Sequence, residues 1–150
     1  MLKTLNPLLN ADVLHCLAAM GHGDSIVLCD SNFPAASVAQ QTASRQLLRM
    51  DGVNCTQMAE AVLSVLPLDT FIDDAAQCME VVGAQSEKPQ VQTEVQAVIH
   101  NIEGERFNLV PVERFEFYER AKRSYAVIAC GELRLYGCFI FTKGVIGPKQ

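Results

Sequence analysis

The hydrophobic positions of this 150-residue chain follow two different spacings, which separate helical segments from strands. Between residues 10 and 21 the apolar side chains recur three and four residues apart, which predicts an amphipathic helix. These are Val13, Leu14 and Leu17. Asn10 is suited to cap the start of this helix and Gly21 to end it. The next run, SIVLC at 25–29, is short and aliphatic with polar neighbours, which predicts a buried strand ending at Asp30.

The middle of the chain continues this succession of short strands and amphipathic helices. The segment SNFPAASVA (31–39) predicts a loop or short helical turn, and RQLLRM (45–50) predicts a brief strand. Asn54 and Gln57 have the spacing of a capping box, and an apolar stripe after them predicts a helix that stops at Pro67. Further along we expect a strand at 78–82, a helix opened by Pro89, a strand at 107–112 and a helix at 113–125.

The last segments predict a β-hairpin. YAVIAC (125–130) and LRLYGCFIF (133–141) flank Gly131 and Glu132. The period of two in the second strand would place four side chains on one side. They are Arg134, Tyr136, Cys138 and Ile140. Because strands and helices alternate with no visible repeat or linker, we expect one α/β domain over residues 1–150, a sheet flanked by helices with a C-terminal β-hairpin.

Composition excludes several classes of protein. The hydrophobic content of 49% is enough for a core, but no apolar stretch approaches the roughly 20 residues of a membrane helix. The N-terminus lacks the segments of a signal peptide, so we expect a cytoplasmic protein. The net charge is −5, with −7 in residues 51–100 and +2 in residues 101–150. No basic stripe emerges, and ERAKRSY fits a solvated helix face, so nucleic-acid binding is not expected.

The cysteines and histidines do not predict a metal site. The six cysteines form no CxxC pair and mostly have apolar neighbours, which favours free, buried thiols. The three histidines, His15, His22 and His100, form no pair at the helical i, i+4 spacing. We therefore expect neither a structural metal nor a disulfide framework.

The segment MGHGDSIVLCDSN (20–32) contains the clearest candidate for chemistry, His22. A buried packing residue would not be flanked by Gly21 and Gly23, because glycine lacks side-chain contacts and loses more conformational freedom on ordering. Imidazole can donate or accept a proton near neutral pH. Asp24 most simply caps the turn after it. Asp30 lies at the carboxyl end of the predicted strand, where ligands collect in open α/β sheets.

Several stretches together resemble one family. PLLNADVLHCLAAMGHGDSIVLCDSNFPA, LPLDT, ERFEFYERAKRSYAVIACGE and LYG…KGV are similar to the fucose mutarotase and ribose pyranase family, more so to its fucose branch. The similarity spans nearly the whole chain, and RFEFYERA with a near-terminal YG is more specific than GHGD alone. The resemblance implies cofactor-free anomer exchange in a reducing monosaccharide, most readily L-fucose. It also implies ring-shaped homo-oligomers, commonly decamers, whose neighbouring subunits complete each site.

The resemblance also assigns roles to individual residues. His22 matches the family's acid/base histidine, Asp30 its sugar-binding aspartate and Arg114 a sugar-binding arginine. Tyr136 and Gly137 match the first two residues of its Tyr-Gly-Asn ligand segment. The third position departs from that pattern, because this chain has cysteine where relatives have asparagine.

These residue types suit ring opening and closure of a hemiacetal. One group must take the anomeric proton and another must protonate the ring oxygen, and His22 can shuttle between these tasks. An ionised Asp30 could accept hydrogen bonds from two adjacent hydroxyls and fix the sugar's rotation about the histidine. Arg114 offers a fork of donors as negative charge develops. Tyr136 offers a hydroxyl and an apolar ring face, and Tyr118 is a further candidate for such a contact.

Each of these residues also has an ordinary structural interpretation. Asp30 could cap a strand end, Arg114 could form a surface ion pair, and Tyr136 and Tyr118 could pack in the core. If the family's contact uses the side chain at Cys138, a sugar hydroxyl loses a hydrogen bond worth about 0.5–1.5 kcal/mol. Two alternatives therefore stay open: a D-ribose pyranase that exchanges pyranose and furanose forms, and a non-catalytic sugar-binding ring protein.

Overall fold

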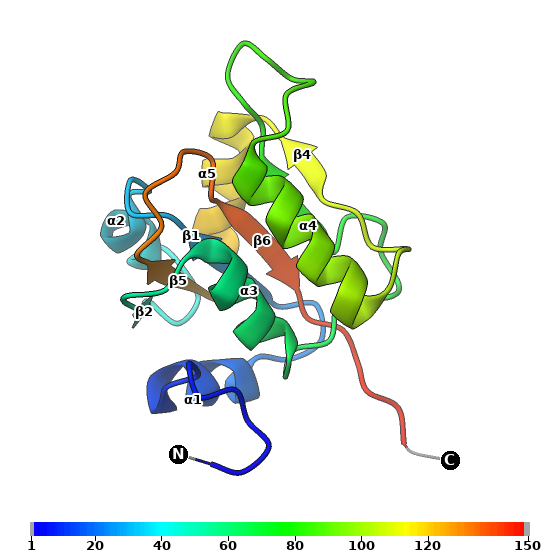
Figure 1. The fold of residues 1–150 in the computed structure, drawn as a ribbon. Helices are drawn as coiled ribbons and strands as arrows, with labels where there is room; N and C mark the ends of the chain where they lie inside the picture. The colour runs from blue at the N-terminus through cyan, green and yellow to red at the C-terminus, as the bar shows by residue number, and fades with distance from the viewer. Residues whose placement is uncertain (1, 149–150) are drawn as a thin grey trace.

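A mixed six-stranded sheet forms the centre of the molecule (Figure 1). The computed structural model describes residues 2–148. The strands are ordered β2-β5-β1-β6-β3-β4, and β6 runs antiparallel to both of its neighbours while the other pairs are parallel. The strands are β1 (Ser25–Cys29), β2 (Leu47–Met50), β3 (Ala76–Met79), β4 (Val110–Val112), β5 (Ala126–Cys130) and β6 (Phe139–Thr142). The helices are α1 (Ala11–Ala19), α2 (Ala35–Ala39), α3 (Cys55–Leu63), α4 (Gln90–Glu103) and α5 (Arg114–Arg123).

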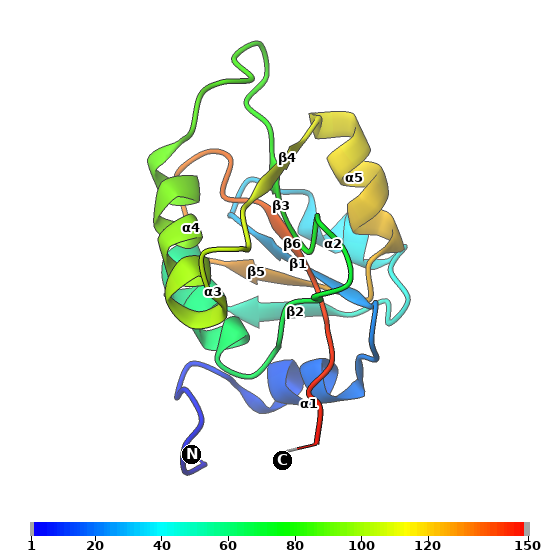
Figure 2. The same ribbon diagram turned by 90° about the vertical axis from the view of Figure 1, so that its right-hand side faces the viewer.

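Helices cover both faces of the sheet, which confirms the predicted α/β class. Figure 2 shows α3 and α4 on one face, α2 and α5 on the other, and α1 at one end of the sheet. In β1, Ile26 and Leu28 belong to the core that includes α3 and α4, whereas Val27 and Cys29 belong to the core that includes α2 and α5. Because β1 is buried on both faces, its apolar run is continuous rather than alternating.

Capping side chains determine where two of the predicted helices begin. Asn10 Oδ1 accepts a hydrogen bond from Val13 N at 3.0 Å, and α1 begins at the residue after Asn10. The predicted capping box is present in α3, where Asn54 and Gln57 each accept a backbone hydrogen bond from the other, at 2.9 and 3.0 Å. The strand expected at 78–82 lies two residues earlier, as β3, because the chain then leaves the sheet for the loop before α4. All six cysteines are free and buried, as predicted.

The predicted C-terminal β-hairpin is wrong. β5 pairs with β1 and β2, and β6 pairs with β1 and β3, so β1 lies between the two segments expected to pair. Residues 131–138, here called the crossover segment, connect β5 to β6 across β1, and the strand begins only at Phe139. Arg134 donates two 3.0 Å hydrogen bonds to the Glu94 carboxylate of α4, which holds the segment away from the sheet. The alternation expected for Arg134, Tyr136, Cys138 and Ile140 is therefore not that of one strand, since only Ile140 lies in β6.

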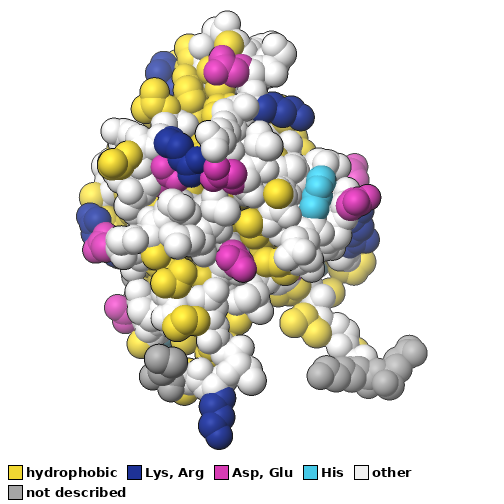
Figure 3. Space-filling model, viewed as in Figure 1, with side chains coloured by type: hydrophobic (Ala, Val, Ile, Leu, Met, Phe, Trp, Pro, Cys, Tyr) yellow, Lys and Arg dark blue, Asp and Glu magenta, His cyan; other side chains and the backbone are white. Residues whose placement is uncertain are grey.

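The surface mixes side chains of all kinds. On the face drawn in Figure 3, basic and acidic side chains are scattered rather than gathered into stripes, and hydrophobic side chains are interspersed over the whole face. Among residues 2–148, no helix has both the length and the apolar character needed to cross a membrane.

Candidate functional site

A pocket of about 180 Å³ lies at the carboxyl ends of β1, β3 and β4. Ligands commonly bind at this place in α/β sheets, because several chain segments converge there. Five of the predicted substrate-binding residues line the pocket: Asp30, Arg114, Tyr118, Tyr136 and Cys138. Asn32 and four apolar residues complete its walls; the apolar residues are Phe33, Met79, Val82 and Leu135. The fold thus brings together residues that are far apart in the sequence.

Asp30 joins the end of β1 to the crossover segment. Its side chain is 3% exposed. Oδ1 accepts hydrogen bonds from the backbone N of Asn32 (2.9 Å) and Phe33 (3.1 Å). Oδ2 accepts one from Gly137 N (3.0 Å), and the Cys138 thiol donates to it at 3.6 Å. Because a carboxylate has about four acceptor positions, most of this group's capacity is used within the chain. Asp30 is therefore a strand-end cap as well as a wall of the pocket.

The crossover segment presents Tyr136 to the pocket in an unusual backbone conformation. Tyr136 has φ +64°, in the left-handed region that most residues avoid. Its hydroxyl accepts a hydrogen bond from Val82 N at 3.2 Å. At the next residue, Gly137, a Cβ atom would lie 3.0 Å from Cys55 Sγ and 3.2 Å from Glu132 Cγ. The close approach of these side chains explains why glycine follows the tyrosine.

Arg114 and Tyr118 come from the first turns of α5. Glu113 Oε2 caps this helix by accepting a hydrogen bond from Phe115 N at 2.8 Å. The guanidinium carbon of Arg114 lies 4.6 Å from the centre of the Phe115 ring, a cation–π distance. Within residues 2–148, Arg114 Nε is the buried side-chain nitrogen that has no hydrogen-bond partner. A buried donor left unpaired costs about 1–3 kcal/mol, so an oxygen of a bound ligand would relieve that cost. Tyr118 packs against Phe33, with ring centres 5.5 Å apart.

Cys138 occupies the position where the family resemblance expects asparagine. The residue is buried, and its thiol lies beside the Asp30 carboxylate. Burial, together with that negative charge, holds the pKa of the Cys138 thiol well above its ordinary value. The side chain is therefore a neutral, weak donor that already contacts Asp30 and offers a ligand no strong acceptor.

His22 lies at the other end of β1. It precedes the first residue of the strand, whereas Asp30 follows the last, and five strand residues at about 3.3 Å each place the two about 16 Å apart. The His22 side chain is 47% exposed. The lining of the pocket does not include it. One chain therefore does not hold a single sugar between its own His22 and Asp30.

Asp69, which the sequence analysis did not single out, holds the His22 imidazole. Asp69 Oδ2 lies 3.1 Å from His22 Nε2, and Asp69 Oδ1 accepts a hydrogen bond from Phe71 N at 3.0 Å. The Phe71 ring packs edge-on against the imidazole, with ring centres 5.6 Å apart. An ionised Asp69 can only accept, so Nε2 is the donor in this pair, which leaves Nδ1 as the unprotonated nitrogen of a neutral imidazole. The carboxylate lies in the LPLDT stretch, but 47 residues separate it from His22 and no local spacing connects them.

Lys143, the residue after β6, holds the loop that contains His22. Lys143 Nζ donates to the carbonyl oxygens of Leu17 (2.8 Å) and Met20 (2.6 Å) at the end of α1. The Lys143 carbonyl accepts a hydrogen bond from Gly23 N at 2.9 Å, where φ is +84° and glycine is favoured. The loop is thus held from several sides while its imidazole stays exposed. Among residues 2–148, no three His, Cys, Asp or Glu side chains are grouped so that they could hold a metal ion.

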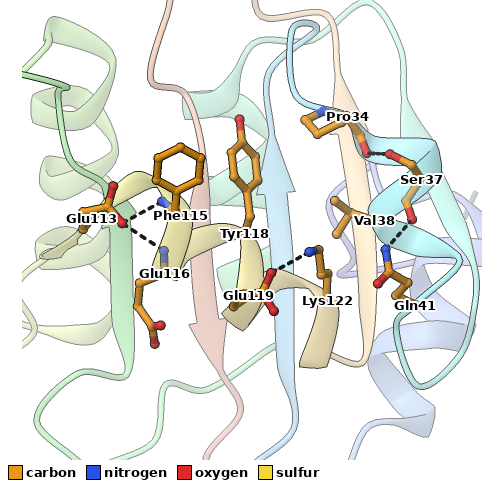
Figure 4. Close-up of a pocket in the computed structure, with 10 residues that line it drawn as sticks. All are labelled: Pro34, Ser37, Val38, Gln41, Glu113, Phe115, Glu116, Tyr118, Glu119 and Lys122. Atoms are coloured by element: carbon orange, nitrogen blue, oxygen red, sulfur yellow. Dashed lines mark hydrogen bonds and ion pairs between the residues drawn. The ribbon is translucent and has the colours of Figure 1, made fainter.

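A larger groove of about 480 Å³ lies between α2 and α5 (Figure 4). Tyr118 is the one predicted site residue in its lining. Several polar side chains in this view pair with each other or with nearby backbone, for example Lys122 Nζ with Glu119 Oε1 at 2.5 Å and Gln41 Nε2 with Ser37 O at 3.3 Å. The groove therefore offers few free polar groups to a sugar, and the smaller pocket is the better candidate.

The fold and the polar pocket define a small-molecule binding protein of the α/β class, and the comparisons identify its family. Residues 3–146 match the RbsD / FucU transport protein family, and the chain belongs to that family. Human fucose mutarotase is 45% identical over 148 residues, which are 97% of this chain and 94% of that protein. A fucose mutarotase from Streptococcus pneumoniae, crystallised with L-fucose, is 36% identical with a TM-score of 0.87, over 97% of this chain and 100% of that one.

A more distant relative shares the fold alone. Bacillus subtilis RbsD, crystallised with D-ribose, has a TM-score of 0.71 and 19% identity over 98% of this chain and 100% of that one. The family resemblance stated from the sequence is thus confirmed.

Proposed function

We propose that this protein is an L-fucose mutarotase, an isomerase that interconverts the α and β anomers of a reducing monosaccharide. One observation supports this most directly. Asp30, Arg114 and Tyr136, which the family resemblance marks as sugar ligands, line a single pocket together with the further candidate Tyr118. They do so in a chain that is 45% identical to human fucose mutarotase over nearly its full length.

The reaction is acid/base chemistry without a cofactor. His22 takes the proton of the anomeric hydroxyl and returns one to the ring oxygen, so that the ring opens, the aldehyde turns, and the ring closes on its other face. Asp69, 3.1 Å from Nε2, fixes the orientation of the imidazole and leaves Nδ1 for the sugar. Arg114 donates to the sugar oxygen on which negative charge develops, using the Nε that has no partner within the chain. Tyr136 places its ring against the C–H face of the sugar.

Two subunits form each site in this proposal. His22 is exposed and lies about 16 Å from Asp30 of its own chain, so His22 of the partner subunit completes the pocket. Exposed apolar side chains flank both halves, Phe71 beside the histidine and Leu133 and Leu135 on the crossover segment, which fits burial between subunits. We propose a cytoplasmic, ring-shaped homo-oligomer, a decamer as in the family pattern. The six free thiols fit a reducing compartment.

Saturation-transfer NMR on equilibrated L-fucose, D-ribose and D-galactose tests the reaction, because it measures exchange between anomers without disturbing their ratio. We expect the protein to speed exchange of L-fucose, and His22→Ala to abolish that effect. Faster pyranose–furanose exchange of ribose would favour the pyranase alternative. Binding without faster exchange would favour a non-catalytic sugar-binding ring, an alternative that Cys138 keeps open.

Mixed oligomers test the shared site. His22→Ala and Arg114→Ala should each be inactive alone. If the two residues of a site come from different subunits, random mixed assembly at equal amounts restores about a quarter of the sites. Recovery of exchange after co-expression is the expected result. No recovery, with assembly intact by light scattering, would place both residues in one chain's site and contradict the two-subunit proposal.

A further inference from the structure

We propose that Gln92 of α4 is a positioning residue of the sugar site, which sets the place of Tyr136 through its side-chain amide. The inference rests on the proposed function and deepens it. Gln92 is buried in the first turn of α4. Its Nε2 donates to Met79 O at 2.8 Å and to Tyr136 O at 3.1 Å. An amide nitrogen has two hydrogens, so this one group links two walls of the pocket, the end of β3 and the crossover segment.

Tyr136 depends on such support. Its φ of +64° is unfavourable for a residue with a bulky side chain, and such a conformation persists only where the surroundings enforce it. Three contacts do so: Gln92 on its carbonyl, Val82 N on its hydroxyl, and Asp30 on the following N–H. Val82 and Asp30 line the pocket, whereas Gln92 does not. Gln92 therefore acts on the sugar only through Tyr136 and Met79.

The same helix holds the crossover segment at a second point. Glu94, two residues after Gln92, accepts two hydrogen bonds from Arg134 at 3.0 Å. The side chains of Glu94 and Arg134 are partly exposed to solvent, whereas Gln92, which contacts the Tyr136 carbonyl, is buried. The ion pair holds the outer part of the segment, and the buried amide determines where the tyrosine backbone lies.

This arrangement predicts a specific kinetic effect. The walls that Gln92 holds contact the sugar in its ground state and in its transition state alike, whereas the acid/base group, His22, lies at the opposite end of β1. Loss of an interaction shared by both states raises KM and leaves kcat unchanged. A variant that merely loosened the fold would not separate the two constants in this way.

Gln92→Met tests the proposal, because methionine has a similar shape and no hydrogen-bonding amide. The chain offers a matched control one turn later on α4. Gln96 Nε2 donates to Phe107 O at 3.0 Å and its Oε1 accepts from Leu109 N at 2.7 Å, so it bridges two backbone groups away from the pocket. For Gln92→Met we expect KM for L-fucose to rise about tenfold, with kcat within about twofold. Gln96→Met should keep the wild-type KM.

A second measurement uses the unaltered chain. On titration with L-fucose, the side-chain NH₂ resonances of Gln92 should shift, and those of Gln96 should not. This result decides the proposal if Gln92→Met does not fold. The role of Gln92 would be overturned by an unchanged KM in Gln92→Met, or by an equal rise of KM in Gln92→Met and Gln96→Met. The proposed function would still stand in either case if the wild-type protein speeds anomer exchange. If the wild-type protein did not speed anomer exchange, the proposed function would be refuted. The chemical shift of the Gln92 side-chain NH₂ group would still show whether sugar binding affects Gln92.

Discussion

The two ends of β1 are built in opposite ways. At the carboxyl end, Asp30 is buried and its oxygens accept four internal contacts, so the pocket wall has its shape before any ligand arrives. At the amino end, the His22 side chain is 47% exposed, and one carboxylate and one aromatic ring hold it. The loop beneath it is fixed, but the imidazole itself faces outward.

This difference follows from what each end has to do. A binding wall gains affinity when its groups are ordered in advance, because less freedom is lost on binding. A proton shuttle must reach the sugar and change its protonation state, which a fully buried imidazole does poorly. If each pocket takes His22 of the partner subunit, assembly brings the exposed group to the rigid wall. Substitutions at the rigid end of β1 should therefore change binding and stability, and substitutions at the exposed end should change the rate of the reaction.

The largest effect is expected for Asp30→Asn at the rigid end. The amide keeps one acceptor oxygen and turns NH₂ donors toward backbone N–H groups that need an acceptor. Two or more buried contacts are lost, so we expect about 3 kcal/mol lower unfolding free energy and no measurable sugar affinity. Urea unfolding at fixed protein concentration measures the unfolding free energy, and calorimetric titration with L-fucose measures the sugar affinity. Asp51→Asn, an exposed neighbour in a loose 3.6 Å ion pair, should change stability by less than about 0.5 kcal/mol.

Glu132, at the start of the crossover segment, should make part of the stability dependent on pH. Hydrogen bonds from Arg134 hold the pKa of this buried carboxyl at about 2. An unfolded glutamate has a pKa near 4.3, so the folded state is favoured while the carboxylate is ionised. The two pKa values correspond to about 3 kcal/mol, and solvent screening at the partly exposed Arg134 lowers the expected contribution to about 2 kcal/mol. This contribution is complete above about pH 5 and is lost as pH falls from about 4.3 toward 2.

Glu132→Gln tests this directly. The difference in unfolding free energy between wild type and variant should be constant from pH 7 to pH 5 and shrink at lower pH. Glu60→Gln, at an exposed position of α3, should show no such convergence. A difference that persisted unchanged at pH 3 would mean that the Arg134 contacts do not stabilise the ionised form.

At the exposed end, Asp69→Asn should affect catalysis more than binding. Asparagine can still accept from His22 Nε2, but the negative charge beside the imidazole is gone, and the second acceptor oxygen, which Phe71 N uses, is lost. We expect roughly tenfold slower anomer exchange with sugar affinity unchanged. Asp73→Asn, at an exposed position of the same turn, serves as the control and should behave as wild type. Weaker sugar binding with an unchanged maximal rate would contradict the division between the two ends.

The sequence predicted those parts of the molecule that local patterns determine. The strand β1 and the Asn54–Gln57 capping box were predicted correctly, because the burial of a strand and the capping of a helix depend on residues close together in the sequence. The predicted hairpin was wrong, because β5 pairs with β1 and β2, which precede it by about 100 and 80 residues. An ion pair with Glu94 also holds the crossover segment off the sheet.

The same limit applies to the site. The pocket residues were named through the family resemblance, and Asp69 was missed because its pairing with His22 exists only in three dimensions. The separation of His22 from Asp30 follows from one simple fact, that a five-residue strand lies between them. Which residues meet across the sheet, by contrast, depends on strand order, and no spacing in the chain encodes that.

The smallest effect is expected at Cys138, within the rigid end. Asparagine there would add two donors and a strong acceptor next to Asp30 Oδ2, to which the thiol now donates at 3.6 Å. One gained or lost neutral hydrogen bond is worth about 0.5–1.5 kcal/mol, so Cys138→Asn should change sugar affinity by a few-fold and alter the ratio between L-fucose and D-ribose. Cys138→Ser, which keeps a single small donor, is the control. Because burial raises the thiol pKa, the wild-type affinity should not vary with pH through this residue between pH 5 and 8. Identical sugar ratios in Cys138→Asn and wild type would show that the side chain does not reach the sugar, and that the backbone of the segment makes the contact instead.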